Sequence, residues 1–255
     1  MIIDLHGMLK SALIARRLGG VRTGFHRSVV KEPLATLFYT KTFNVPLSEP
    51  AVNRYCAMIA ASLGVSLDPG TLAGKAPFLF YLPEHAAITA DYFRHDRKNI
   101  VLVPETSIDY KNYPKDKWVA VATALKENIL VCHGSHAELA TANYLAEHSP
   151  YVTILPRLNL NQLKAVISRA DLVIGGDTGP THMAWACNVP SLALFGATSI
   201  PYGMGQRHRA LTSGSAVNRR RPDKRDFSIG RIVVDEIVRQ AEELLAIGND
   251  EKSRE

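Results

Sequence analysis

From about residue 99 onward, short apolar runs alternate with amphipathic stretches in a regular order. The runs are too short for buried helices, which predicts strands at 100–103, 129–132, 152–155, 172–174 and 192–195. The stretches between them have helical spacing and predict helices at 117–126, 137–147, 160–169 and 181–186, with Asn159 as the N-cap of the third. Strands that alternate with helices in this way predict a parallel sheet covered on both faces.

Polar, glycine-bearing loops follow the predicted strands. Parallel sheets of this kind bind ligands beyond the carboxyl ends of their strands. The candidate binding loops are therefore 104–107, 133–135, 156–158 and 176–179.

The first part of the chain has a different pattern. A strand at 2–5 is followed by helical stretches at 8–18, 33–39 and 51–63, and Pro69-Gly70 suggests a boundary. A lone strand makes an incomplete parallel sheet. We therefore expect an α/β chain with a partial N-terminal domain at 1–70 and a complete domain at 71–255, whose last helix, 233–246, precedes a frayed tail.

Composition narrows the functional classes. The chain has 255 residues, 46% of them hydrophobic, and no run long enough to span a bilayer. Cys56, Cys132 and Cys187 form no CxxC pair, which indicates a reduced, cytoplasmic protein. The net charge of +6 favours anionic partners. Nucleic acid is disfavoured, because the basic clusters at 10–31 and 219–225 carry no interleaved aromatic residues or known binding module.

The stretch 170–196 reads as a buried strand, a glycine-rich turn, a helix and a second strand. Backbone conformations closed to larger residues are open to Gly175, Gly176 and Gly179. Asp177 or Thr178 can cap the helix. Pro180 suits its first turn, because backbone N–H groups in the first turn have no intrahelical partner and proline lacks this group. Free N–H groups and the positive helix end then form an anion site, which predicts a phosphate-bearing ligand such as a nucleotide.

Several segments together resemble a known family. They are IIDLHGMLKSALIARRL, KEPLATLFY, ETSIDYKNYPKDKW, GSHAE, ADLVIGGDTGPTHMA and FGATS. The chain resembles the ADP-heptose glycosyltransferases of lipopolysaccharide inner-core synthesis, and among them the heptosyltransferase I group; a second-heptose enzyme stays open. The resemblance implies the GT-B fold, with two Rossmann-like domains.

The resemblance also implies a reaction. Enzymes of this family transfer L-glycero-D-manno-heptose from ADP-heptose to the Kdo of Kdo₂-lipid A with inversion, so ADP-heptose is a substrate and no cofactor is expected. Their acceptor implies a peripheral position at the cytoplasmic face of the inner membrane.

Matching positions suggest a donor site. Thr106, Ser107 and Lys111 correspond to the loop that holds the donor phosphates, where hydroxyls and an ammonium group balance the charge of departing ADP. Glu138 corresponds to the residue on the ribose hydroxyls, although glutamate in a first helical turn is also an ordinary choice. Leu158 corresponds to an apolar residue beside the adenine, but a leucine after a strand is more often a core residue.

The DTGPTH segment contributes the remaining donor-site residues. Thr178 and Gly179 offer N–H groups to the diphosphate, and His182 donates to a phosphate or sugar oxygen. Asp177 either binds a heptose hydroxyl or caps the helix. No two aspartates lie two positions apart, so the chain has no DxD motif, and we expect no obligatory metal.

Members of the family have a first strand and a Gly/Ser-rich loop, and this loop carries the aspartate proposed as their general base. The match to this chain begins after that region. No residue of this chain is therefore assigned as general base, and we expect it to bind ADP-heptose or ADP but to transfer sugar weakly or not at all. Basic residues remain for the anionic acceptor or the membrane: Lys10, Arg16, Arg17 and Lys31. A non-catalytic nucleotide-sugar-binding module is the alternative; an oxidoreductase or NTPase is disfavoured, because no GxGxxG or P-loop is present.

Overall fold

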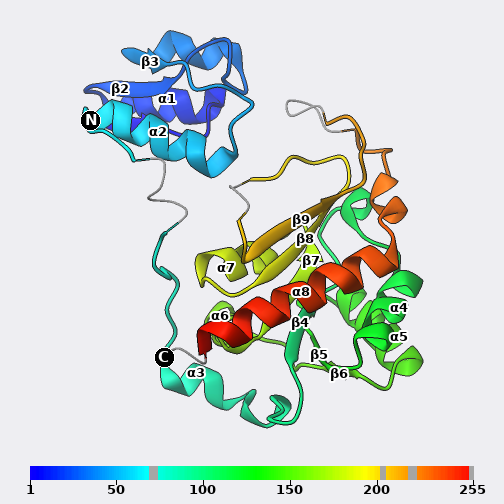
Figure 1. Cartoon of the computed structure of the whole chain (residues 1–255). Coiled ribbons are helices and arrows are strands. Elements are labelled where there is room, and N and C mark those ends of the chain that lie inside the picture. Colours follow the sequence, from blue (N-terminus) through cyan, green and yellow to red (C-terminus); the bar gives the residue numbers. More distant parts are fainter. Residues whose placement is uncertain (69–73, 202–204, 218–222, 253–255) are drawn as a thin grey trace. The chain divides into compact units, whose positions relative to one another are not determined.

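The structure, a computed structural model, describes residues 1–68, 74–201, 205–217 and 223–252, with side chains described as far as residue 247 (Figure 1). These residues form two compact units. Unit 1 comprises 1–68, 74–75 and 199–201, and unit 2 comprises 76–198, 205–217 and 223–252. The expected boundary at 70/71 lies outside the described residues, as do Arg219, Arg220 and Arg221 of the second basic cluster.

Unit 2 is built on a six-stranded sheet in the order β6-β5-β4-β7-β8-β9, with all neighbouring strands parallel. The strands are β4 (Asn99–Val103), β5 (Asn128–Val131), β6 (Val152–Ile154), β7 (Leu172–Gly176), β8 (Ser191–Phe195) and β9 (His208–Thr212). The first five were predicted, and β9 was not. The parallel sheet expected from the strand–helix alternation is therefore present.

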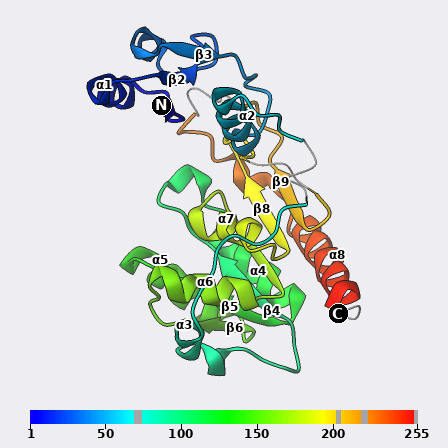
Figure 2. The ribbon, with the colours of Figure 1, turned by 90° about the vertical axis from the view of Figure 1, so that its left-hand side faces the viewer.

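Helices cover both faces of this sheet. They are α3 (Pro83–Ala87), α4 (Lys115–Leu125), α5 (His136–His148), α6 (Leu160–Arg169), α7 (Gly179–Ala186) and α8 (Val234–Lys252). Alternate residues of the strands face opposite sides: Ile100 and Leu102 pack in the cluster of α4, α5 and α8, whereas Val101 and Val103 pack in that of α6 and α7. Figure 2 shows α8 on the opposite side of the sheet from α6 and α7. The described part of α8 runs past the expected end at 246.

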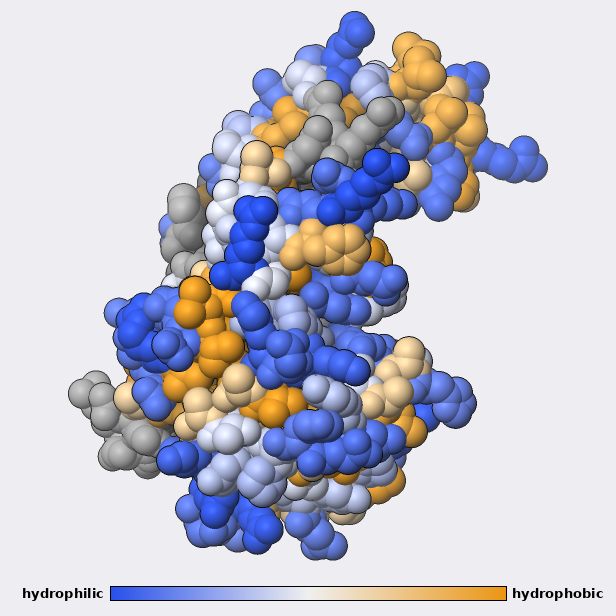
Figure 3. Space-filling model, turned by 90° about the vertical axis from the view of Figure 1, so that its right-hand side faces the viewer, coloured by the Kyte–Doolittle hydropathy of each residue, from blue (hydrophilic) through white to orange (hydrophobic). Residues whose placement is uncertain are grey.

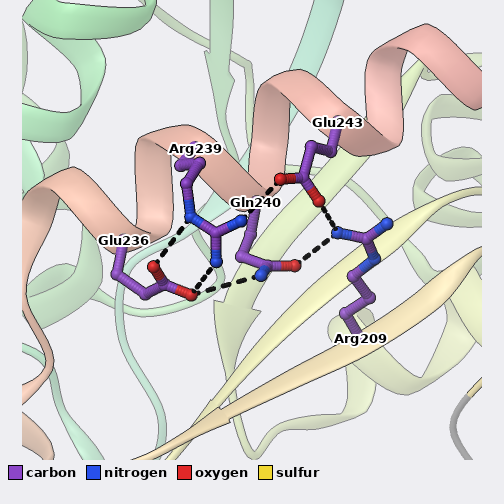
Figure 4. Close-up of polar contacts among 5 residues, drawn as sticks. All are labelled: Arg209, Glu236, Arg239, Gln240 and Glu243. Carbon is purple, nitrogen blue, oxygen red and sulfur yellow. Dashed lines mark hydrogen bonds and ion pairs between the residues drawn. The ribbon is translucent and has the colours of Figure 1, made fainter.

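A polar network ties α8 to the edge strand β9 (Figure 4). Arg209 on β9 donates to Gln240 and Glu243 of α8. Arg239 donates in turn to Glu236 and Glu243, both within one turn of the helix. The network lies beside the apolar contact of Ile237, Ala241 and Leu244 with the sheet, so polar and apolar contacts hold the same helix in place.

Unit 1 contains three parallel strands, β1 (Ile2–Asp4), β2 (Arg22–Phe25) and β3 (Lys41–Phe43), in that order. The helices are α1 (Leu9–Leu18), the 3-10 helix η1 (Pro33–Phe38) and α2 (Ala51–Leu63). The expectation of a lone strand is wrong, because β2 and β3 continue the sheet from β1. At the end of β1 the buried Asp4 accepts hydrogen bonds from the His6 and Gly7 N–H groups and from Ser11 and Tyr39.

Figure 3 shows hydrophilic residues over most of one face of the molecule, with hydrophobic residues in separate patches. In unit 1, α1 and η1 expose leucine and isoleucine side chains, among them Ile14, Leu18 and Leu37. Within the described ranges, no helix combines the length and apolar character needed to cross a membrane.

Candidate functional site

The candidate site lies where β4 and β7 end. These strands are neighbours, with Val103 opposite Gly175, so the segments that follow them emerge at the same edge of the sheet. The loop after β4 leads into the short 3-10 helix η4 (Asp109–Lys111), and β7 leads through Asp177 into α7. Sheet order therefore brings together two segments that are far apart in the sequence.

Two glycines at the end of β7 allow these segments to approach closely. A Cβ on Gly175 would lie 2.5 Å from Thr181 Oγ1 and 2.8 Å from Val103 Cβ. A Cβ on Gly176 would lie 3.1 Å from Thr106 Cγ2 and 3.2 Å from the Lys111 carbonyl oxygen. The expectation that the glycines supply unusual backbone conformations is wrong, since none of Gly175, Gly176 and Gly179 has a positive φ. At the first two positions they provide space instead.

The side chains of Lys111 and His182 meet at the Asp177 carboxylate. Lys111 Nζ donates to Asp177 Oδ2 at 2.6 Å, and His182 Nε2 lies 3.0 Å from Asp177 Oδ1. All three side chains are mostly buried. Burial raises the pKa of Asp177, but the hydrogen bonds from His182 and Lys111 and the charge of Lys111 outweigh it and lower that pKa to about 2. Asp177 is therefore ionised at neutral pH and holds both neighbours in place.

Of the two residues expected to cap α7, Thr178 occupies the N-cap position, but its side chain makes no capping hydrogen bond. The Thr178 N–H donates instead to the Gly176 carbonyl. Gly179 is exposed at the first helical position and Pro180 lies in the first turn, as expected. Of the two predicted N–H donors, Thr178 is thus used within the turn, whereas the Gly179 N–H at the positive helix end has no hydrogen bond among the described residues, and its role on an anion stays a prediction.

The loop after β4 holds itself in shape. The Thr106 hydroxyl lies 3.0 Å from the Ile108 carbonyl oxygen and 2.9 Å from Asn112 Oδ1, and its single proton is donated to one of the two; Asn112 Oδ1 also accepts the Thr106 N–H. Thr106 is buried, so its hydroxyl shapes the loop, whereas Ser107 is exposed. The sequence reasoning missed Asn112, because a loop asparagine carries no signal that distinguishes a structural role from a solvated one.

Glu138 and Leu158 lie after neighbouring strands of the same sheet. Glu138 is half-buried in the first turn of α5, where its carboxylate accepts the Gly134 N–H and its own N–H donates to Ser135 Oγ. Leu158 is half-buried and packs against the core of α6 and α7. The structure does not bring either side chain to the Lys111–Asp177–His182 cluster through a contact, so the roles on ribose and adenine stay predictions.

The opposite edge of the sheet carries a hollow of about 970 Å³, lined in part by Arg94, Arg97 and Arg169. Helices α6 and α7 end there, so their negative carbonyl ends face it and oppose anion binding. Its basic residues fit the usual pairing of cations with helix C-termini. The phosphate site at the carboxyl edge stays a prediction from the sequence.

Two further expectations concern metals and the acceptor. The described part of the chain contains no group of three or more His, Cys, Asp or Glu residues placed to hold a metal ion. In unit 1 the four basic residues predicted to face the acceptor or the membrane are exposed: Lys10, Arg16, Arg17 and Lys31. The Arg16 guanidinium group lies over the Phe38 ring.

Comparison with known proteins places the chain in a family. The family model "Glycosyltransferase family 9 (heptosyltransferase)" matches residues 1–226. The chain belongs to glycosyltransferase family 9. Lipopolysaccharide heptosyltransferase 1 of Campylobacter coli is 29% identical over 257 residues, covering 95% of this chain and 75% of that protein. The Escherichia coli K12 protein of the same name is 32% identical over 203 residues, and the match covers 77% of this chain but only 60% of that protein.

Solved structures of the family share the fold. E. coli heptosyltransferase WaaC with ADP has a TM-score of 0.72 at 24% identity, over 95% of this chain and 72% of that one. E. coli ADP-heptose heptosyltransferase II has a TM-score of 0.68 at 18% identity, over 97% and 76%. The expected family and the GT-B type of α/β fold are confirmed.

Proposed function

We propose that the chain binds ADP-heptose at the carboxyl edge of the unit 2 sheet and serves its transfer to the Kdo of Kdo₂-lipid A in lipopolysaccharide inner-core synthesis. The observation that carries this proposal is the cluster of Lys111, Asp177 and His182 beside the N-terminus of α7. A family 9 relative, WaaC of E. coli, has been solved with ADP and with ADP-2-deoxy-2-fluoro heptose.

The chemistry requires stabilisation of a leaving group. As the acceptor hydroxyl attacks the anomeric carbon, the bond to ADP breaks and negative charge grows on the departing diphosphate. The Lys111 ammonium group and the N-terminus of α7 supply positive charge at that point, and Ser107 offers an exposed hydroxyl. The acceptor proton needs a general base, which we assign to no residue of this chain.

We also propose that the protein acts peripherally at the cytoplasmic face of the inner membrane. The exposed basic residues of unit 1, together with the exposed apolar residues of α1 and η1, support this location. Flotation with vesicles of phosphatidylglycerol, compared with phosphatidylcholine vesicles, tests it; equal recovery with both would contradict an electrostatic contact.

Calorimetric titration with ADP tests the donor site. We expect binding, and we expect Lys111→Ala and His182→Ala to weaken it by about 1–3 kcal/mol each, the scale of a lost charge-assisted hydrogen bond. Lys164→Ala, which removes a lysine from α6, is the matched control and should leave the affinity unchanged. Unchanged affinity in both site variants would remove the assignment. A parallel assay of transfer to Kdo₂-lipid A separates an active transferase from a non-catalytic ADP-heptose-binding module.

A further inference from the structure

The loop after β4 makes one contact to a neighbouring helix that the residues assigned to the donor do not explain. Glu105 lies directly before Thr106 in this loop, and its carboxylate accepts a hydrogen bond from the Thr141 hydroxyl of α5. Both side chains of this bond are half-buried. A hydrogen bond to a carboxylate is roughly twice as strong as one between neutral groups, and partial burial protects it from competing water. Glu105 therefore fastens the loop to α5.

The order of the strands explains why the loop reaches α5. β4 lies between β5 and β7, and α5 follows β5 along the chain. On the β7 side, Lys111 bonds to Asp177, and a Cβ on Gly176 would lie 3.1 Å from Thr106 Cγ2. On the β5 side, Glu105 supplies the corresponding attachment. The loop is thus held from both sides of its own strand.

A second contact joins the same face of α5 to the segment after β4. Lys115, at the start of α4, lies over the Tyr144 ring, with Nζ 4.1 Å from the ring centroid. Residues three positions apart share a face of a helix, so Glu138, Thr141 and Tyr144 lie along one side of α5. Glu138 is the residue predicted to bind the ribose. The bond from Glu105 is therefore about one helical turn away from it.

We propose that Glu105 is a positioning residue: through Thr141 it holds the Glu138 end of α5 at a fixed position relative to the diphosphate loop. ADP carries its ribose and its diphosphate in one molecule, so both subsites must lie at the right separation at the same time. A site that already has this separation loses less conformational freedom when the ligand enters, and it binds more tightly. This role rests on the proposed donor site and adds to it the residue that joins its two halves.

Calorimetric titration of the 255-residue chain with ADP tests this role. Thr141→Val keeps the shape of the side chain and removes the hydroxyl, so the dissociation constant for ADP should rise by roughly fivefold or more. Thr141→Ser keeps the hydroxyl and should retain the affinity. Glu105→Ala should have the same effect as Thr141→Val. The double variant should bind no more weakly than either single variant, because all three lack the same bond.

Thr123→Val is the matched control. Thr123 Oγ1 on α4 lies 3.1 Å from Oγ of Ser149, the residue that ends α5 on the side away from Glu138. This change also removes a hydroxyl and one bond between α4 and α5 while keeping the shape of the side chain. Urea unfolding measures what each change costs in stability. A bond with a purely structural role would change stability alone, so Thr123→Val should leave the ADP affinity unchanged, unlike Thr141→Val.

Three results would overturn the proposal: unchanged ADP affinity in both Thr141→Val and Glu105→Ala, an equal loss of affinity in Thr123→Val, or the full loss in Thr141→Ser. The wild type and Lys111→Ala keep this role apart from the donor site. ADP binding that Lys111→Ala weakens but Thr141→Val does not would contradict the positioning role alone. No ADP binding by the wild type would contradict the donor site, and the positioning role with it.

Discussion

Lys111 and Asp177 form an ion pair across the ends of two neighbouring strands, with Lys111 Nζ 2.6 Å from Asp177 Oδ2. The same carboxylate lies 3.0 Å from His182 Nε2. One negative charge thus holds both side chains that we assign to the proposed donor site. It also neutralises the ammonium group that a diphosphate would contact, so the ligand competes with Asp177 for Lys111.

The first prediction concerns this competition. Asp177→Asn removes a negative charge close to the proposed diphosphate position and should tighten ADP binding by about 1 kcal/mol, the size of one partly screened charge–charge interaction. Calorimetric titration at low salt and at about 0.15 M salt measures the gain, which should shrink as salt rises. Weaker binding by Asp177→Asn would instead mean that positioning of Lys111 and His182 outweighs neutralisation.

The second prediction concerns stability at low pH. The pKa of Asp177 in the folded protein is about 2, below its ordinary value of 3.8. A depressed folded pKa stabilises the protein above the unfolded pKa, and this contribution is lost as the pH falls from about 4 towards 2. Its size is about 2 kcal/mol for a shift of this extent.

Urea unfolding of the wild type and of Asp177→Asn over this pH range is the measurement. The difference in free energy of unfolding should be constant between pH 5 and 7 and should shrink below pH 4. A difference that stays the same down to pH 2.5 would show that the ion pair does not control the titration of Asp177.

Local pattern was sufficient to predict much of the fold. The helices α2 and α6 begin and end where their apolar periodicity predicts, and Asn159 caps α6 with a reciprocal bond from Gln162. Five strands of unit 2 were predicted because each is a short, mainly apolar run; β4, β5, β7 and β8 are fully buried, whereas the edge strand β6 is half-buried.

The strands of unit 1 that the sequence did not predict, β2 and β3, lack such an apolar run. β3 has three residues, and β2 contains Gly24, which is a poor strand former but is required by the Tyr39 ring. These residues form strands because they pair with neighbouring strands of the sheet, and the local sequence pattern does not encode that pairing. The Lys111–Asp177 contact was missed for the same reason, since it spans 66 positions and depends on β4 lying beside β7.

The third prediction separates two roles of neighbouring glycines. Gly175→Ala should destabilise the protein by about 1–3 kcal/mol, because its Cβ would meet Thr181 and the backbone of Val103. Gly176→Ala faces looser contacts, so it should cost less stability but weaken ADP binding by displacing the Thr106–Lys111 loop.

Gly179→Ala is the matched control, because nothing lies within 4 Å of a Cβ at that position. Urea unfolding and ADP calorimetry on the three variants provide the two readouts. A Gly179→Ala cost equal to that of Gly175→Ala would mean that backbone freedom, not space, is what these glycines provide.

The fourth prediction concerns Thr181, which is fully buried in the first turn of α7 with its Oγ1 lacking a hydrogen-bond partner among the described residues. A buried hydroxyl without a partner lowers stability, and valine has the same shape without it. Thr181→Val should therefore leave the free energy of unfolding unchanged or raise it by up to about 1 kcal/mol. Thr181→Ser keeps the hydroxyl and removes a buried methyl, so it should cost about 1 kcal/mol. Urea unfolding of both variants decides the matter: a loss on Thr181→Val larger than on Thr181→Ser would show that the hydroxyl is bonded in solution, and that Thr181 holds α7 through a polar contact as well as through its packing against Gly175.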